Sequence, residues 1–191
     1  APVSVNGTQA TFVVPAEQDG TAGDGADIMV STPTQHGPLT AIPEVEDHSG
    51  MSMSMNRMMH QFRFYVPEED RLLGDEKIER ILLKFPTAVT GNVTFDVADL
   101  SAPAQFSAGQ ADVVLNLENP IGVSVGDQHQ YACLAFVPVQ FAEGESLEIV
   151  KAYTDDKIAF FDPIDLKGKN CLPGHSTPVM LKVRELVDYA G

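Results

Sequence analysis

The fold is decided by residues 79–117, ERILLKFPTAVTGNVTFDVADLSAPAQFSAGQADVVLNL. Apolar and polar residues alternate in three short segments of this stretch. The apolar residues of each segment are Ile81, Leu83 and Phe85, then Val93, Phe95 and Val97, and then Val113, Leu115 and Leu117. A repeat of two predicts half-buried β-strands, because successive side chains of a strand point to opposite sides. The breaks at Thr90-Gly91-Asn92 and Ser101-Ala102-Pro103 contain the residue types that turns favour.

Segments with strand character recur along the rest of the chain, separated by Gly, Pro, Asn or Asp. They are residues 9–14, 27–31, 51–55, 62–66, 78–85, 92–97, 112–117, 130–139, 147–153, 157–161 and 178–183. Many short strands without long amphipathic helices predict an all-β, mostly antiparallel sandwich. Residues 130–139 are apolar on both faces, so we expect them in the middle of a sheet. One short helix is expected at residues 68–73, between Pro67 and Gly74.

Length and charge limit the classes of protein to which the chain can belong. At 191 residues it can build one sizeable core, and no repeat or long linker divides it, so we expect residues 1–191 to form a single domain. The net charge is −15, which argues against nucleic acid and anionic membranes as partners, because both are polyanions. No apolar stretch approaches the roughly 20 residues that a transmembrane helix needs.

The motifs of common enzymes are missing. Gly174-His175-Ser176 lacks the G-x-S-x-G order of a nucleophile elbow, and there is no GxGxxG, P-loop or HExxH motif. We therefore expect no enzymatic activity, no catalytic residues and no cofactor.

Two other sets of residues have an ordinary interpretation. Asp19, Asp24 and Asp27 do not have the spacing of an EF-hand loop and are expected to form an acidic turn. Cys133 lies in an apolar run and Cys171 in a polar loop, and their spacing does not decide between a disulfide and two free thiols.

The most unusual local composition is a methionine run that ends in a histidine. Its members are Met51, Met53, Met55, Met58, Met59 and His60. Three thioethers on one face of a strand, with an imidazole near them, would suit Cu(I), so a periplasmic copper-binding sandwich is one alternative function. The simpler interpretation is a strand whose methionines pack into an irregular core, with no metal bound. A carbohydrate-binding sandwich with an acidic groove is a second alternative, although the chain has no Trp to stack on sugars.

Several segments taken together resemble the fimbrillin-like proteins of Bacteroidales. The resemblance rests on the order of DIMVS (27–31), FRFYV (62–66), ILLKF (81–85) running into TGNVTFDV (90–97), LEIV (147–150), LKGKN (166–170) and GHSTPVMLKV (174–183). It covers nearly the whole chain. It implies a transthyretin-like two-sheet β-sandwich that serves as a structural or accessory subunit of a pilus or adhesin. It also implies export to the cell surface, in a fimbrium associated with the outer membrane.

The resemblance further implies assembly with other pilus subunits by strand exchange, and contact with a host or bacterial surface ligand. A missing strand leaves an apolar groove with unpaired backbone groups, and a strand of the next subunit satisfies both. The candidate exchanging strands are the terminal segments, residues 9–14 and 178–183. In this family an N-terminal strand is removed by a cut after Arg or Lys. Because no Arg or Lys precedes Arg57, we expect Ala1 to follow any such cut, or this member to mature in another way.

Overall fold

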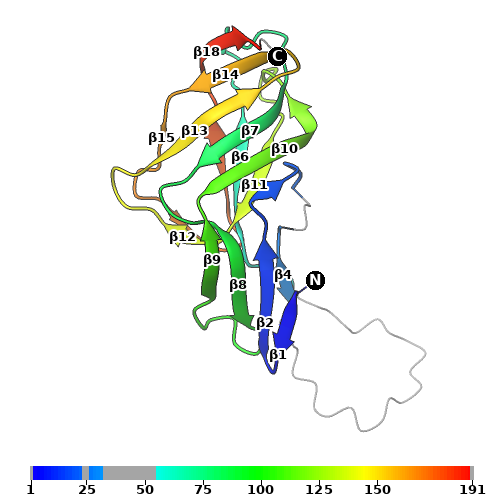
Figure 1. Ribbon diagram of the computed structural model, residues 1–191, viewed down its shortest axis with the longest axis vertical. Helices are drawn as coiled ribbons and strands as arrows, with labels where there is room; N and C mark the ends of the chain where they lie inside the picture. The colour runs from blue at the N-terminus through cyan, green and yellow to red at the C-terminus, as the bar shows by residue number, and fades with distance from the viewer. Residues whose placement is uncertain (1, 23–25, 32–54, 190–191) are drawn as a thin grey trace, which may run out of the picture.

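The computed structural model describes residues 2–22, 26–31 and 55–189, which form β-strands joined by turns and loops (Figure 1). Within these ranges there is no helix, and none of these residues belongs to an apolar helix of membrane-spanning length. Most strand pairs are antiparallel, and two sheets stack face to face. The predicted all-β sandwich is confirmed.

The larger sheet of the sandwich has seven strands. In spatial order they are β18 (Val183–Asp188), β14 (Lys157–Phe161), β13 (Ser146–Tyr153), β7 (Ile78–Lys84), β10 (Asp112–Ile121) and β3 (Glu17–Gln18), with β15 (Ile164–Asp165) also pairing with β13. Its pairs are antiparallel except β3 with β10. Alternate residues of β7 and β10 are buried, among them Ile81, Leu83 and Leu115, because one face of each strand turns toward the second sheet.

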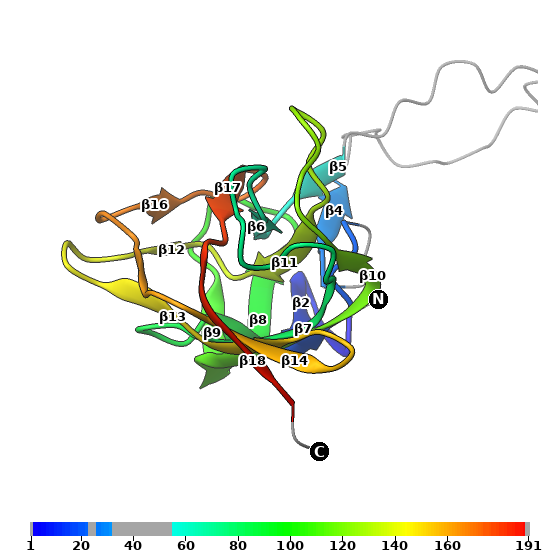
Figure 2. The ribbon, with the colours of Figure 1, turned by 90° about the horizontal axis from the view of Figure 1, so that it is seen from above.

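The second sheet consists of β11 (Ala132–Phe136), β6 (His60–Tyr65) and β17 (Ser176–Met180), with β17 parallel to β6. Figure 2, which looks along the long axis, shows β6, β11 and β17 in one layer and β7, β13 and β14 in the other. Phe62, Phe64 and Leu134 meet the residues of β7 and β10 in the main core. A short pair, β12 (Val139–Gln140) and β16 (Asn170–Cys171), lies beside the sandwich.

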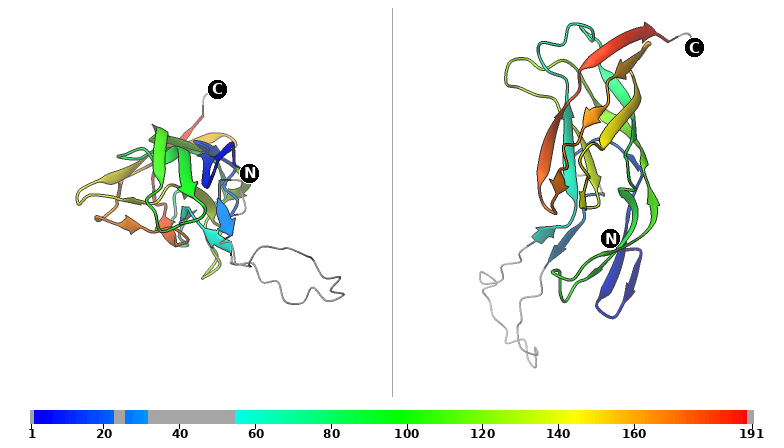
Figure 3. Two further views of the ribbon diagram at one scale, coloured as in Figure 1. Left: turned by 90° about the horizontal axis from the view of Figure 1, so that it is seen from below. Right: turned by 90° about the vertical axis from the view of Figure 1, so that its left-hand side faces the viewer.

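A third sheet extends from one end of the sandwich (Figures 1 and 3). Its order is β1 (Ser4–Asn6), β2 (Gln9–Val14), β8 (Thr90–Asp96) and β9 (Gln105–Gln110). β8 continues the chain from β7, and β9 leads into β10. Hydrogen bonds from the Phe85 N–H to the Ala111 carbonyl (2.9 Å) and from the Val89 N–H to the Gln110 carbonyl (2.9 Å) hold the bend together. One face of this sheet packs on the pair β4 (Met29–Ser31) and β5 (Met55–Arg57), which creates a second, smaller core.

The expected turn at Thr90-Gly91-Asn92 is wrong, because these residues begin β8. Gly91 has a φ of 142°, and the pairing with β9 shifts register between Thr90 and Asn92. A Cβ at Gly91 would lie 2.8 Å from the carbonyl oxygens of Ser107 and Ala108. The glycine therefore marks a β-bulge rather than the end of a strand.

The expected helix at residues 68–73 is also wrong. The segment is a loop built around the buried carboxylate of Asp70, which accepts hydrogen bonds from the Leu72 and Leu73 N–H groups (3.0 and 3.1 Å). Its second oxygen accepts from the Val183 N–H (2.8 Å). Aspartate favours loops where its side chain can bond nearby backbone groups, and here it also ties the loop to β18.

Residues 130–139 do not lie in the middle of a sheet as expected. They divide into β11 and the start of β12, and β11 is the end strand of its sheet. Its outer edge is covered instead of paired. The Gln18 side chain bonds both backbone groups of Ala135, and the Gly20 carbonyl accepts from the Cys133 N–H (2.8 Å). All five residues of β11 are buried, because Ala132, Leu134 and Phe136 pack in the main core and Ala135 packs in the smaller core on the other face.

Both candidate exchanging strands are paired within the chain. Residues 9–14 form β2, which lies between β1 and β8. Residues 178–183 divide between β17, in the three-stranded sheet, and β18, at one edge of the larger sheet.

Candidate functional site

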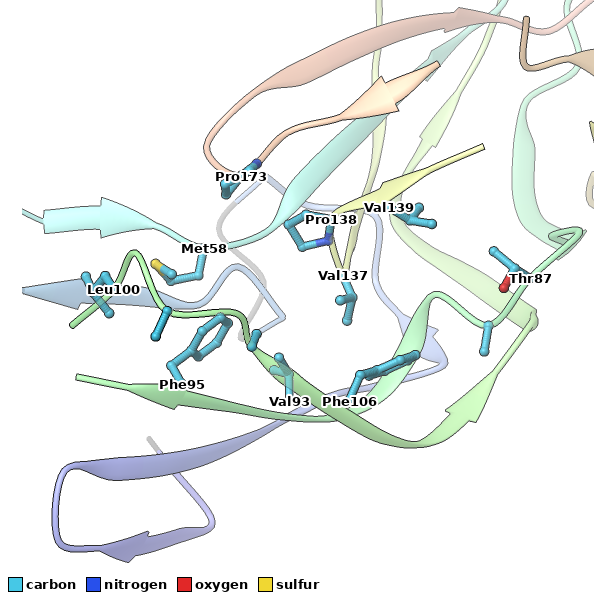
Figure 4. Close-up of a pocket in the computed structure, with 13 residues that line it drawn as sticks. Met58, Thr87, Val93, Phe95, Leu100, Phe106, Val137, Pro138, Val139 and Pro173 are labelled. Atoms are coloured by element: carbon cyan, nitrogen blue, oxygen red, sulfur yellow. The ribbon is translucent and has the colours of Figure 1, made fainter. Parts of the chain in front are cut away.

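The candidate site is an apolar groove at the open side of the smaller core (Figure 4). One wall is the face of β8 and β9, from which Val93, Phe95 and Phe106 point into the groove. The opposite wall is the segment that follows β11, residues 137–139. The groove encloses about 530 Å³, within the range of roughly 300–1,000 Å³ that ligand sites occupy.

The lining of the groove is almost entirely hydrocarbon. Val93, Phe95 and Met58 also belong to the smaller core, whereas Phe106 is 38% exposed at the rim of the groove. The full set of lining residues is Met58, Thr87, Ala88, Val93, Phe95, Leu100, Ala102, Ala104, Phe106, Val137, Pro138, Val139 and Pro173. None of them has a titratable side chain, so the groove suits apolar side chains rather than a charged or reacting group.

The groove adjoins a strand edge to which no strand of the described residues pairs. β9 is the end strand of its sheet, and all six of its residues are exposed. An end strand offers N–H and C=O groups on its outer side to a further strand. An extended chain beside β9 could therefore satisfy those groups while placing every second side chain in the groove.

The other edge of the same sheet is β1, which is also fully exposed. Val3 and Val5 are 63% and 64% exposed. Val5 lies opposite Ala10, Ala10 lies opposite Phe95, and residues directly opposite each other in a sheet share a face. Val5 therefore projects from the same face of the sheet that forms the groove wall.

The methionine run divides among several environments. Met51 and Met53 lie outside the described residues, and Met55 is 52% exposed on β5. Met58 and Met59 are buried in the smaller core. Met58 and Met59 therefore fill a core as the simpler interpretation expects, whereas Met55 does not.

His60, the last member of the run, is buried with both ring nitrogens engaged. Nδ1 lies 2.8 Å from the Leu172 carbonyl oxygen, and Nε2 lies 2.8 Å from the Thr177 hydroxyl. Burial lowers the pKa of His60, opposed by the hydrogen bond to Leu172, so the neutral ring is favoured. Neither nitrogen is left to bind a metal, and this arrangement gives no support to the copper alternative.

The two cysteines are buried free thiols, so they are not joined in a disulfide. Burial raises the pKa of both, that of Cys171 to about 11. Among the described residues, no cluster of three or more His, Cys, Asp or Glu side chains has the arrangement of a metal site.

The acidic residues near the N-terminus form turns and an ion pair. Asp19 accepts hydrogen bonds from the backbone N–H and the hydroxyl of Thr21, as expected for an acidic turn. Asp27 pairs with Arg57 at 3.1 Å, and Asp24 lies outside the described residues.

Sequence reasoning missed the groove. Its lining comes from separate segments of the chain, and β9 (QFSAGQ) has no alternation of apolar and polar residues to mark it as a strand.

Comparison with known proteins gives little additional information. No family model and no curated protein matches the chain. Among solved structures, the chain is similar to a "putative cell adhesion protein" from Bacteroides ovatus, with 15% sequence identity and a TM-score of 0.42. The similarity covers 74% of this chain and 49% of that one, so the chain spans about half the length of that structure. Similarity at this level assigns no function, and the resemblance to fimbrillin-like proteins stays a prediction from the sequence.

Proposed function

We propose that this chain is a structural or accessory subunit of a bacterial surface pilus or adhesin, and that copies of it join edge to edge. In this proposal β1 of one copy lies beside β9 of the next. The observation that carries the proposal is the groove at the β9 edge, which has no charged lining and matches the exposed valines at the β1 edge.

The two edges complement each other chemically. No described strand pairs with the outer side of β9, so β9 offers its backbone groups and the apolar groove, and β1 offers its backbone groups together with Val5 and the preceding Val3. Pairing them would continue the sheet from one molecule into the next, as strand addition does in other recognition systems. The valines would enter the groove near Phe106 and lose their contact with water.

This geometry leads to a chain of subunits rather than a closed dimer. β1 and β9 are different surfaces on opposite edges of one sheet, so the contact is head to tail. A head-to-tail contact leaves one free edge at each end and can repeat without limit if its rotation does not close a ring. A pilus subunit needs this property, and we propose neither an enzymatic role nor a cofactor for it. The export and surface location implied by the resemblance belong to the same proposal.

The test places one acidic side chain at each edge. Phe106→Glu puts a charge at the groove, and Val5→Glu puts a charge on β1. Both positions are exposed, so the fold should tolerate either change. Val125→Glu is the matched control, because Val125 is 76% exposed and does not line the groove. Sedimentation velocity over a range of concentrations reports the assembly, and negative-stain images report its shape.

We expect the wild type and Val125→Glu to form concentration-dependent oligomers, and each edge variant alone to stay monomeric. A mixture of the two edge variants should form dimers and nothing larger, because each variant keeps the edge that the other lacks. The proposal is overturned if the wild type is monomeric at its highest soluble concentration. It is also overturned if either edge variant assembles as the wild type does.

A further inference from the structure

A second cavity lies on the outer face of the three-stranded sheet, away from the β9 groove. It encloses about 500 Å³ and shares no lining residue with the groove. Gln61 and Arg63 point into it because they alternate along β6 with the buried residues His60, Phe62 and Phe64. The lining residues are Gly20, Thr21, Ala22, Arg57, Gln61, Arg63, Asn119, Tyr131, Cys133 and Ser176.

The charge of this cavity is the opposite of the charge of the protein. The chain has 27 acidic and 12 basic side chains, yet two arginines and no carboxylate line the cavity. Arg57 is paired with Asp27, whereas no carboxylate of the described residues lies within 4.0 Å of Arg63. The guanidinium of Arg63 is therefore a positive charge that no described side chain neutralises, which favours an anionic ligand.

Arg63 is held in a fixed position. Its guanidinium carbon lies 4.1 Å from the centre of the Tyr131 ring. Tyr131 in turn packs edge-on against Tyr65 and His129, with ring centres 5.8 and 5.7 Å away. A guanidinium stacked on an aromatic ring keeps its N–H groups free in the plane of the fork, the arrangement that grips a carboxylate with two parallel bonds.

The remaining polar groups of the cavity are uncharged. Gln61 and Asn119 contribute amides, and Thr21, Ser176 and Tyr131 contribute hydroxyls. Among the residues that the structure describes, the side chains of Gln61 and Asn119 make no hydrogen bond. Amides and hydroxyls can each donate and accept, which suits a ligand with several hydroxyl groups around its anionic group.

We propose that this cavity binds an acidic sugar, a uronic or sialic acid unit of a glycan. Its carboxylate lies on the Arg63 guanidinium, and its ring hydroxyls bond the amides of Gln61 and Asn119. The site is independent of the edge-to-edge assembly, because the two surfaces have no residue in common.

The test measures binding of three small probes by ligand-observed NMR: sodium glucuronate, glucose and sodium sulfate. Glucuronate has both the carboxylate and the hydroxyls, glucose has only the hydroxyls, and sulfate has only the charge. We expect glucuronate to bind at least about tenfold more tightly than either of the others, because only it uses both halves of the site. Glucuronate binding is also measured with the Phe106→Glu variant, which changes the groove and not this cavity. Equal binding by this variant and the wild type would show that the sugar site does not depend on the edge-to-edge assembly.

Variants locate the binding. Arg63→Gln removes the charge and should weaken glucuronate binding at least about tenfold, and Arg63→Lys should weaken it less. Asn119→Ala leaves the stacked arginine in place and should also weaken glucuronate binding. Arg71→Gln is the matched control, because it removes an exposed arginine that does not line the cavity. Backbone NMR spectra of each variant check the fold.

Three results would overturn the proposal. Equal binding of glucose would remove the role of the carboxylate, and equal binding of sulfate would leave a plain anion site. Unchanged glucuronate binding by the folded Arg63→Gln and Asn119→Ala variants would place the sugar elsewhere.

Discussion

Gln18 closes one edge of the sandwich with a side chain, and replacing it should lower the stability of the whole fold. The residue is 4% exposed on β3. Its Nε2 donates to the Ala135 carbonyl (2.7 Å) and to the Pro15 carbonyl (3.0 Å), and its Oε1 accepts from the Ala135 N–H (3.0 Å). One amide thus stands in for the strand that would otherwise pair with β11.

The expected loss of stability can be worked out from the backbone groups that lose their hydrogen-bond partner. Gln18→Met keeps the length and apolar contacts of the side chain but leaves the Ala135 N–H and C=O groups unpaired. An unsatisfied buried group costs about 1–3 kcal/mol, so the two together should lower the free energy of unfolding by about 2–6 kcal/mol. Gln18→Glu keeps the acceptor and turns a carboxylate oxygen toward the Ala135 carbonyl, so it should be no more stable than Gln18→Met.

Chemical denaturation followed by far-ultraviolet circular dichroism measures the change. Gln140→Met is the matched control, because Gln140 is an exposed residue of the short strand β12. The control should stay within about 0.5 kcal/mol of the wild type. If Gln18→Met also stays within that limit, the amide does not stabilise the edge of β11.

Three further predictions concern buried polar groups. Because burial lowers the pKa of His60, the unfolded chain takes up a proton near pH 6.5 before the folded chain does. Stability should therefore fall as the pH drops below about 6.5 and level off below the folded pKa, and denaturation curves should show a smaller fall for His60→Gln. Asp70→Ala removes the acceptor for three backbone N–H groups, including that of Val183, and should lower the free energy of unfolding by about 3 kcal/mol or more. Thermal and chemical denaturation curves that match those of the wild type would contradict this. With a pKa of about 11, only about one Cys171 thiol in a thousand is ionised at pH 8. A thiol reagent should therefore label Cys171 rapidly only in denaturant, and peptide mass spectrometry measures the labelling.

The alternation of residues predicted the strands that bury one face. Residues 9–14 and 157–161 match β2 and β14 at both ends, and β7, β8 and β10 were located within a few residues. The pattern is reliable in these strands because a buried face selects apolar side chains at every second position. The breaks between strands were less predictable, because glycine is favoured both in turns and at β-bulges, and Gly91 lies at a bulge.

Two features of the structure left weaker signals in the sequence. β9 buries neither face, so nothing in its composition separates it from a loop. β11 is apolar on both faces, like a central strand, because its two faces pack in different cores, while Gln18, more than 100 positions away, covers its edge. Contacts between residues so far apart in the sequence depend on the tertiary fold, and local composition does not predict them. The methionine run is the opposite case: its composition is unusual, but Met58 and Met59 only pack in the smaller core.

The two cores share continuous backbone, because β7 runs on into β8 through residues 85–89 and β9 runs on into β10 through Ala111. Figure 1 places β1 near one end of the long axis and β18 near the other. A tensile load applied along that axis would thus pass through covalent strands that cross both halves of the molecule. The halves could therefore part only if these strands themselves unfolded. The continuous strands thus let the molecule transmit a pulling force from one end to the other without relying on hydrogen bonds between its halves.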